Sequence, residues 1–438
     1  MSGSALGRRP LLAAGALAAL AALRPGLPAA SEPSRGVVFV PAWGMGRRLM
    51  EAGGPEGLAS ADPEASRWAD RLGTPRGLRS AVVRLEPSRG AVRRRLLPVS
   101  AHAIVMSPDG RRLLVAPMEQ RAWFVLDAET LEIEGDPLVL SEAFVGGGHA
   151  AFLPGGEMLT VERRPQRAFT GREEDHEGRL VVRDPATRRP LAEMGAGGMA
   201  PHDVALLPGG RIAAVACYGS ITPTPVRLSD GSFRRAPPQV IASRVAVVDL
   251  ADGRVLEAFS SLDPDAELRH LALHGRRLVV GQTRIGMETH PEAGTRRPEA
   301  LPYPQDTLGQ AYLPAAPLQG TLGGEGGRLA PVGGLAPAET VHALSLVADL
   351  AHGEILMTFP ASNLVVVIDA ADGTLRRTID VGALGCRHPC GIGLLDARTW
   401  VVAGHEGGLF AFGRGDHAPR RSLWMDVDLA GHSHLLAV

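Results

Sequence analysis

The feature that most constrains this chain is a repeated unit: a histidine, a short alternating strand, a turn rich in proline and glycine, and a second apolar strand. One copy begins at His202 and passes through the turn Pro208-Gly209-Gly210 into the apolar residues 212–216. Other copies begin at His102 and His149. Because glycine tolerates the positive φ of tight reversals, the unit predicts β-hairpins joined in series.

Each copy continues with a third strand that ends in aspartate, a turn, and a fourth strand. Self-similarity at about 45 residues, with four strands in each copy, is typical of a β-propeller. Counting the copies predicts an all-β fold of seven blades, each with four antiparallel strands; six and eight blades are the alternatives. The segment from Ser422 to the end is expected to supply a strand that closes the ring with N-terminal residues.

The chain divides into a signal segment, residues 1–30, and a single propeller domain, residues 31–438. Three stretches rich in proline, glycine or charge interrupt the repeats and are expected to be insertions, at about 50–78, 221–239 and 286–340. With 45% hydrophobic residues, the chain has ample apolar material for one large core.

The N-terminus resembles a twin-arginine export signal, because Arg8-Arg9 precedes the apolar residues 13–23 and small residues follow at 27–30. A plain Sec signal is the alternative. We expect a periplasmic, monomeric mature protein with no membrane span, since no other stretch is long and apolar enough. A net charge of −1 provides no electrostatic basis for binding nucleic acid.

The repeated histidines are the candidate site. The first strand of each propeller blade lines the central channel, so His102, His149, His202 and His270 are expected to converge at one channel mouth. His388 or His342 could add to them. Imidazole binds iron, copper, zinc and nickel, which predicts a transition-metal ring. The alternative is that each histidine bonds the backbone of the neighbouring blade, and that duplication alone repeats it.

Two charged neighbours complete the predicted site as ligand-binding residues. Asp203 follows His202 directly, and it is one of few acidic residues near the repeated histidines. Arg269 precedes His270 and could orient an anion at the channel mouth.

Three cysteines and a histidine pair carry weaker signals. Cys217 lies in an apolar strand, which indicates a buried, inert thiol. The sequence Cys386-Arg387-His388-Pro389-Cys390 favours a local disulfide in an oxidising compartment, with a soft metal site or free thiols as the alternatives. His432 and His434 are expected to belong to an ordinary polar tail, with weak metal binding as the alternative.

The repeats, especially residues 363–369 with Asp380-Val381-Gly382, resemble YVTN-type propellers. The export signal, Gly148-His149, Pro201-His202 and Leu268-Arg269-His270 together resemble an exported family of unknown function, number fifteen-thirteen of the domain-of-unknown-function series. This resemblance implies a propeller over about residues 36–412, no established reaction, and an association with periplasmic imelysin-like iron-uptake proteins as partners. The chain departs from the pattern at 286–340 and 386–390.

These observations favour a periplasmic propeller that binds a metal, a metal complex or a partner protein at the histidine-lined mouth. An enzyme is the main alternative, because propellers also host lactonases and quinone- or metal-dependent oxidoreductases. A lactonase would place carboxylates and asparagine around its metal, whereas the repeated residue here is histidine. A structural interaction scaffold is the third hypothesis.

Overall fold

The structure is a computed structural model of the whole chain. It describes residues 36–42, 62–74, 80–165, 169–221, 226–227, 233–234, 239–287, 301–302, 310–324, 328–336, 339–429, 431 and 434–438. The predicted signal segment, residues 1–30, and His432 lie outside these ranges. Within the described part of the chain, no helix has the length and apolar character needed to cross a membrane.

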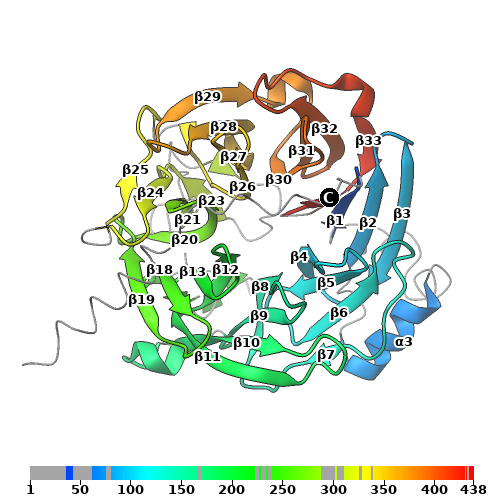
Figure 1. Ribbon diagram of the computed structural model, residues 1–438. Coiled ribbons are helices and arrows are strands. Elements are labelled where there is room, and N and C mark those ends of the chain that lie inside the picture. The colour runs from blue at the N-terminus through cyan, green and yellow to red at the C-terminus, as the bar shows by residue number, and fades with distance from the viewer. Residues whose placement is uncertain are drawn as a thin grey trace, which may run out of the picture.

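The described residues form seven antiparallel blades around a central axis, as predicted (Figure 1). From the axis outward, the first blade consists of β34 (Leu436–Ala437), β1 (Val38–Ala42), β2 (Ser80–Glu86) and β3 (Ala91–Leu97). The second consists of β4 (Ala101–Met106), β5 (Arg112–Pro117), β6 (Ala122–Asp127) and β7 (Leu138–Val139). The third consists of β8 (Val145–Phe152), β9 (Met158–Arg163), β10 (Glu177–Arg183) and β11 (Pro190–Met199).

The remaining blades follow in chain order. The fourth consists of β12 (Pro201–Leu206), β13 (Ile212–Cys217), β18 (Arg244–Asp249) and β19 (Val255–Ser260). The fifth is built on β20 (Ala266–His274), β21 (Arg277–Met287), β24 (Leu318–Thr321) and β25 (Ala330–Pro331). The sixth consists of β26 (Leu346–Asp349), β27 (Glu354–Phe359), β28 (Leu364–Asp369) and β29 (Leu375–Asp380). The seventh consists of β30 (Pro389–Leu394), β31 (Thr399–Gly404), β32 (Gly407–Gly413) and β33 (Met425–Asp428).

The two ends of the chain close the ring, as predicted from the C-terminal segment. Strand β34 pairs antiparallel with β1, with Leu436 opposite Phe39. Val37 and Val438 exchange two backbone hydrogen bonds of 2.9 Å beside this pair. The last strand of the chain is therefore the innermost strand of the first blade, and this places the C-terminal residues beside the axis.

Apolar layers between neighbouring blades form the core. Each blade is covered on both faces, so a central strand can be apolar throughout rather than alternating; every residue of β13 is apolar and buried. One layer joins the last blade to the first through Val401 and Ala411 on one side and Val38 and Val83 on the other. This packing holds the inner strands in a fixed relation around the channel.

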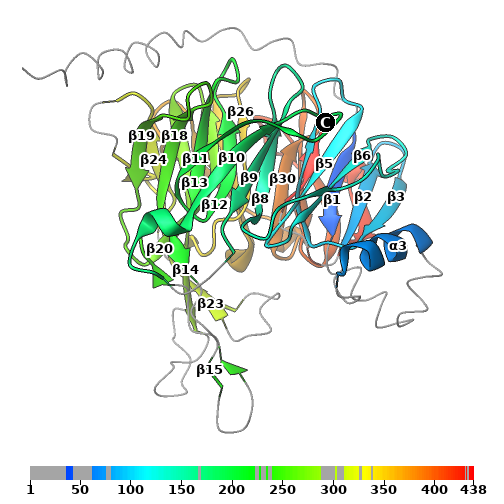
Figure 2. The ribbon, with the colours of Figure 1, turned by 90° about the horizontal axis from the view of Figure 1, so that it is seen from below.

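The loops between the second and third strands carry insertions on one face of the ring. Helix α3 (Pro63–Leu72) and the short strands β14 (Ser220–Ile221), β15 (Val226–Arg227) and β23 (Gln310–Leu313) all lie at this face (Figure 2). Because adjacent strands run antiparallel, the same face holds the beginnings of the inner strands, where the repeated histidines lie. The insertions therefore border the histidine-lined mouth.

Two of the predicted insertions contain more regular structure than expected. Within 50–78, residues 63–72 form α3, since the Asp62 side chain caps its first turn and Gly73 ends it with a φ of 59°. Within 286–340, β24 pairs with β21 and belongs to the fifth blade itself. Strands β24 and β25 have only four and two residues, too few for an alternating pattern to be visible in the sequence.

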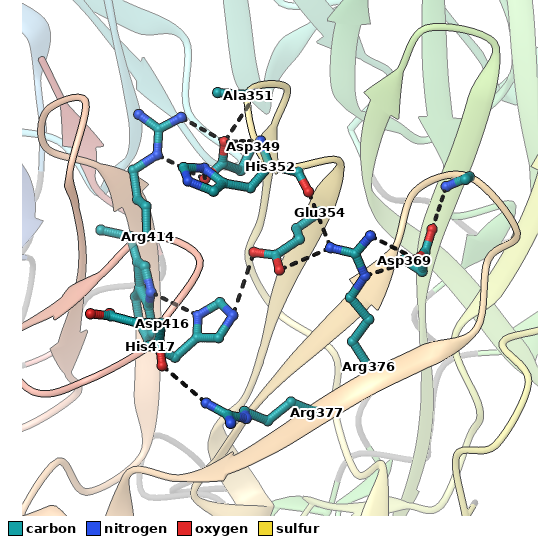
Figure 3. A network of polar contacts seen from close by, with 12 residues as sticks. Asp349, Ala351, His352, Glu354, Asp369, Arg376, Arg377, Arg414, Asp416 and His417 are labelled. Atoms are coloured by element: carbon teal, nitrogen blue, oxygen red, sulfur yellow. Dashed lines mark hydrogen bonds and ion pairs between the residues drawn. The ribbon is translucent and has the colours of Figure 1, made fainter.

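A polar network joins the sixth blade to the seventh on the opposite face from the histidines (Figure 3). Arg414, just after β32, contacts both oxygens of Asp349 with its Nε and Nη2 at 2.7 and 2.5 Å. His417 accepts a hydrogen bond from the Trp400 indole through Nδ1, and its Nε2 lies 3.4 Å from Glu354. Glu354 also contacts Arg376, so the network spans both blades.

Candidate metal centre

Five histidines from five consecutive blades meet at the channel mouth. His102, His149, His202 and His270 lie on the inner strands β4, β8, β12 and β20 of blades two to five. His434 precedes β34, the inner strand of blade one. One ring nitrogen from each histidine can be chosen so that all five lie within 4.8 Å of one another. The ring centroids of adjacent pairs are 4.5–5.5 Å apart.

Irregularities of the strands turn these side chains toward one another. The pairing of β4 with β5 shifts register around His102, and that of β12 with β13 shifts around His202. Similar shifts occur before Ala150 in β8 and before His270 in β20. A β-bulge re-aims the side chain at its position, so the repeat encodes the direction of each histidine as well as its place.

A glycine makes room for the converging rings. Gly148 has a φ of 109°, which L side chains rarely adopt, and a Cβ there would lie 2.8 Å from ring carbons of both His102 and His202. Gly148 is therefore a packing requirement of the histidine cluster, whereas a Cβ at Gly146 would meet Pro117 and one at Gly147 would meet Pro201 and Val161.

Two of the histidines have their tautomers set by neighbours. His202 donates from Nδ1 to the Gly147 carbonyl at 2.6 Å, so its Nε2 carries the lone pair. His149 Nδ1 lies 3.1 Å from Asp203 Oδ1. Asp203 is held in turn by the backbone N–H groups of Val204, at 2.8 Å, and Leu271, at 3.0 Å. A carboxylate that accepts from one nitrogen of a histidine and leaves the other for a metal is a common second layer of metal sites.

Burial keeps the cluster uncharged. Desolvation lowers the pKa of His149 to about 3 and holds those of His102, His202 and His270 well below their usual value. Desolvation also raises the pKa of Asp203 to about 6, so this carboxylate is ionised at neutral pH. Neutral imidazoles with available lone pairs are the form that binds metals.

The nitrogens fit a metal ion. His102 Nε2 and His149 Nε2 are buried and have no hydrogen-bond partner among the described residues. His202 Nε2 and His270 Nε2 are 2.9 Å apart. Two ligands at right angles on a metal with bonds of about 2.1 Å would be about 3.0 Å apart, and opposite ligands about 4.2 Å apart. The cluster is therefore close to the size of a single coordination sphere.

The structure brings together four of the five histidines predicted as ligands. The backbone-bonding alternative describes His202 only in part, since its second nitrogen still faces the cluster. His388 lies outside the cluster, with Nδ1 3.1 Å from the Pro360 carbonyl. His342 stacks on Tyr312, with centroids 3.9 Å apart, and is also outside it. Whether the clustered histidines bind metal stays a prediction.

The two charged residues predicted at the site both lie beside it. Asp203 supports His149, as described above. Arg269 contacts Glu267 through Nη2 at 2.5 Å and lies over the Tyr218 ring, with its Cζ 4.9 Å from the centroid.

The predicted disulfide is not formed. Cys386 and Cys390 are thiols in this structure, and they pack in different apolar clusters, Cys386 against Trp400 and Cys390 against Leu344. Cys217 is a buried thiol as predicted, and burial raises its pKa to about 12.

His434 was missed because it lies outside the repeats. Its Nδ1 is 3.3 Å from the Ser345 hydroxyl, which orients the ring from the sixth blade. The prediction that the C-terminal segment closes the ring contained the necessary signal. A histidine two residues before the closing strand occupies nearly the same place as the histidines that begin the other inner strands.

The comparisons with known proteins support the family and the fold. Residues 96–305 match the family "Protein of unknown function (DUF1513)", a range that contains His102, His149, His202 and His270 but not His434. The YVTN-type resemblance is not shown. No curated protein matches the sequence.

A solved structure with 15% identity is similar to the chain in fold alone. Hydrazine synthase from Kuenenia stuttgartiensis has a TM-score of 0.53 and 15% identity, over 76% of this chain and 90% of that one. The dihydro-heme d1 dehydrogenase NirN has a TM-score of 0.47 and 10% identity, over 81% of this chain and 63% of that one.

Proposed function

We propose that this protein, which over residues 96–305 belongs to a family of unknown function, is an exported propeller that holds one transition-metal ion. The ligands are His102, His149, His202, His270 and His434. The observation that carries the proposal is the convergence of five ring nitrogens within 4.8 Å, supplied by five consecutive blades. If each histidine only stabilised its own blade, the five rings would not need to face one another.

The energetic argument points the same way. A buried nitrogen without a partner costs about 1–3 kcal/mol, so the two at His102 and His149 cost about 2–6 kcal/mol together. The net stability of a protein is about 5–15 kcal/mol. A metal ion that accepts these lone pairs removes that cost, which supports a metal-bound resting form.

The five imidazole ligands limit which metal ions the site is expected to bind. Structural zinc sites are nearly always tetrahedral, whereas five imidazoles suit an ion with five or six ligands. We propose iron or copper in preference to zinc. When bound, such an ion supplies Lewis-acid or one-electron chemistry. The protein's own contribution is to position five neutral ligands, hold a proton between His149 and Asp203, and exclude water from the buried side.

The proposal also includes export through the twin-arginine-like signal and interaction with periplasmic iron-uptake proteins. A metal-dependent oxidoreductase is the second candidate. The observation that favours it is that the His149 side chain is 12% accessible although its Nε2 is buried, so the site lies directly beneath the surface.

Elemental analysis of the exported protein, purified without added metal, tests the proposal. We expect about one equivalent of one transition metal per chain, and its loss in His149→Ala/His202→Ala. His388→Ala is the control, because this histidine lies outside the cluster. Substoichiometric metal in the unaltered protein, or metal retained by the double variant, would refute the metal centre.

A further inference from the structure

Two arginines and a tyrosine lie on the mouth side of the histidine cluster. Arg163 ends β9, Tyr218 follows β13, and Arg269 lies at the bulge of β20, so three consecutive blades contribute one residue each. The Cζ atoms of Arg163 and Arg269 are 5.9 and 4.9 Å from the centroid of the Tyr218 ring. That ring is 4.5 Å from the ring of His202. We call these three residues the arginine–tyrosine layer.

Arg163 has unused hydrogen-bond donors. Its side chain is 1% exposed, and its ion pair with Glu119 uses Nη2. Its Nε and Nη1 are buried without a hydrogen-bond partner in the described part of the chain. Buried guanidinium donors of this kind are costly unless a ligand accepts from them. The layer therefore has a capacity for an acceptor that the described residues do not fill.

The net charge around the proposed metal centre also favours the binding of an anion. Glu119 balances Arg163, and Glu267 balances Arg269. The neutral histidines contribute no charge, and Asp203 contributes one negative charge beside His149. A divalent ion at the centre would leave a net charge of about +1. Five imidazoles also leave one position open in a six-coordinate site.

We propose that this open position binds a small carboxylate or a similar singly charged oxyanion, whose charge faces Arg163 and Arg269. The inference rests on the proposed metal centre and deepens it by naming the ligand class. Guanidinium is the group best suited to bind a carboxylate, because its planar donors match the two oxygens. The two arginines also disfavour the approach of a bare cation, so the anion and the metal are expected to occupy the site together.

Formate titration of the copper(II)-loaded protein tests the anion site. Visible absorption of the copper is followed at constant ionic strength, with perchlorate as the balancing anion. Arg163→Met removes one guanidinium and leaves only the exposed Glu119, whose side chain is 57% accessible. Because Glu267 is buried, Arg269 is removed in the charge-balanced variant Glu267→Gln/Arg269→Met. Arg164→Met is the matched control, since Arg164 is exposed and lies over the Phe144 ring.

We expect a saturable formate-dependent shift of the copper spectrum. Its dissociation constant should rise about tenfold or more in Arg163→Met and in the double variant, and remain unchanged in Arg164→Met. Copper binding itself should persist in all of them. Copper binding without a formate response, or a response that is equal in all variants, would overturn the anion site alone. A protein that binds no copper, iron or zinc would overturn the metal centre as well.

Discussion

Replacement of Asp203 by asparagine should weaken metal binding through His149. The Asp203 carboxylate faces three donors at once: His149 Nδ1 at 3.1 Å, Val204 N at 2.8 Å and Leu271 N at 3.0 Å. Asp203 Oδ1 faces both His149 Nδ1 and Val204 N, and Oδ2 faces Leu271 N, so the NH₂ group of an amide must face either the first two donors or the Leu271 N–H. In the first case the tautomer of His149 that leaves Nε2 for the metal is no longer favoured.

The expected loss is about 10–100-fold in metal affinity, the usual effect of removing such a support, or about 1.4–2.7 kcal/mol. Competition with a chelator of known affinity measures it. A double-mutant cycle with His149→Ala distinguishes this mechanism from a general disruption of the fold. Asp203→Asn should cause no further loss of metal affinity once His149 is absent. Equal losses in both backgrounds, or wild-type affinity in Asp203→Asn, would refute the reasoning.

Three further predictions concern the cluster and the ring. As pH falls below 6.5, the metal-free protein should lose about 1.4 kcal/mol of unfolding free energy per pH unit through His149 alone. The reason is that His149 takes up a proton near its ordinary pKa in the unfolded chain, but only near pH 3 in the folded chain. Equal unfolding free energies from urea titrations at pH 7 and pH 5.5 would contradict this prediction. Gly148→Ala should lower metal affinity at least tenfold by chelator competition, whereas Gly156→Ala, with a φ of 94° and open space around its Cβ, should not. Arg414→Met should cost about 1.5–3 kcal/mol in urea unfolding, because the buried Asp349 loses its guanidinium partner and keeps only weaker contacts with His352 Nδ1 and the N–H groups of Ala351 and His352. The double change with Asp349→Asn should recover part of that loss, and no difference between the two variants would argue against the blade contact.

Most of the propeller architecture could be predicted from the repeat unit. A period of about 45 residues with turns at fixed places predicts four-stranded blades because each blade is one local hairpin series. The four repeated histidines could be placed together for the same reason. Elements without a repeat were harder to predict: β24 and β25 are too short to show alternation, and α3 is indicated only by Asp62-Pro63 and Gly73.

Long-range features of the site lay beyond the repeat. His434 joins the cluster because β34 pairs with β1, a contact between the two ends of the chain. Arg163 reaches the same mouth from the second strand of a blade, where the repeat has no histidine. The prediction of a disulfide was wrong because the spacing of Cys386 and Cys390 along the chain does not indicate that they lie in different apolar layers.

The most direct test of the metal centre is anomalous X-ray diffraction from crystals of the protein purified with its native metal. We expect one anomalous peak at the channel mouth, surrounded by nitrogens of His102, His149, His202, His270 and His434, at bond lengths of about 2.0–2.1 Å. No peak at the mouth, or a peak held by other residues while these five rings bond only to one another and to the backbone, would contradict the account.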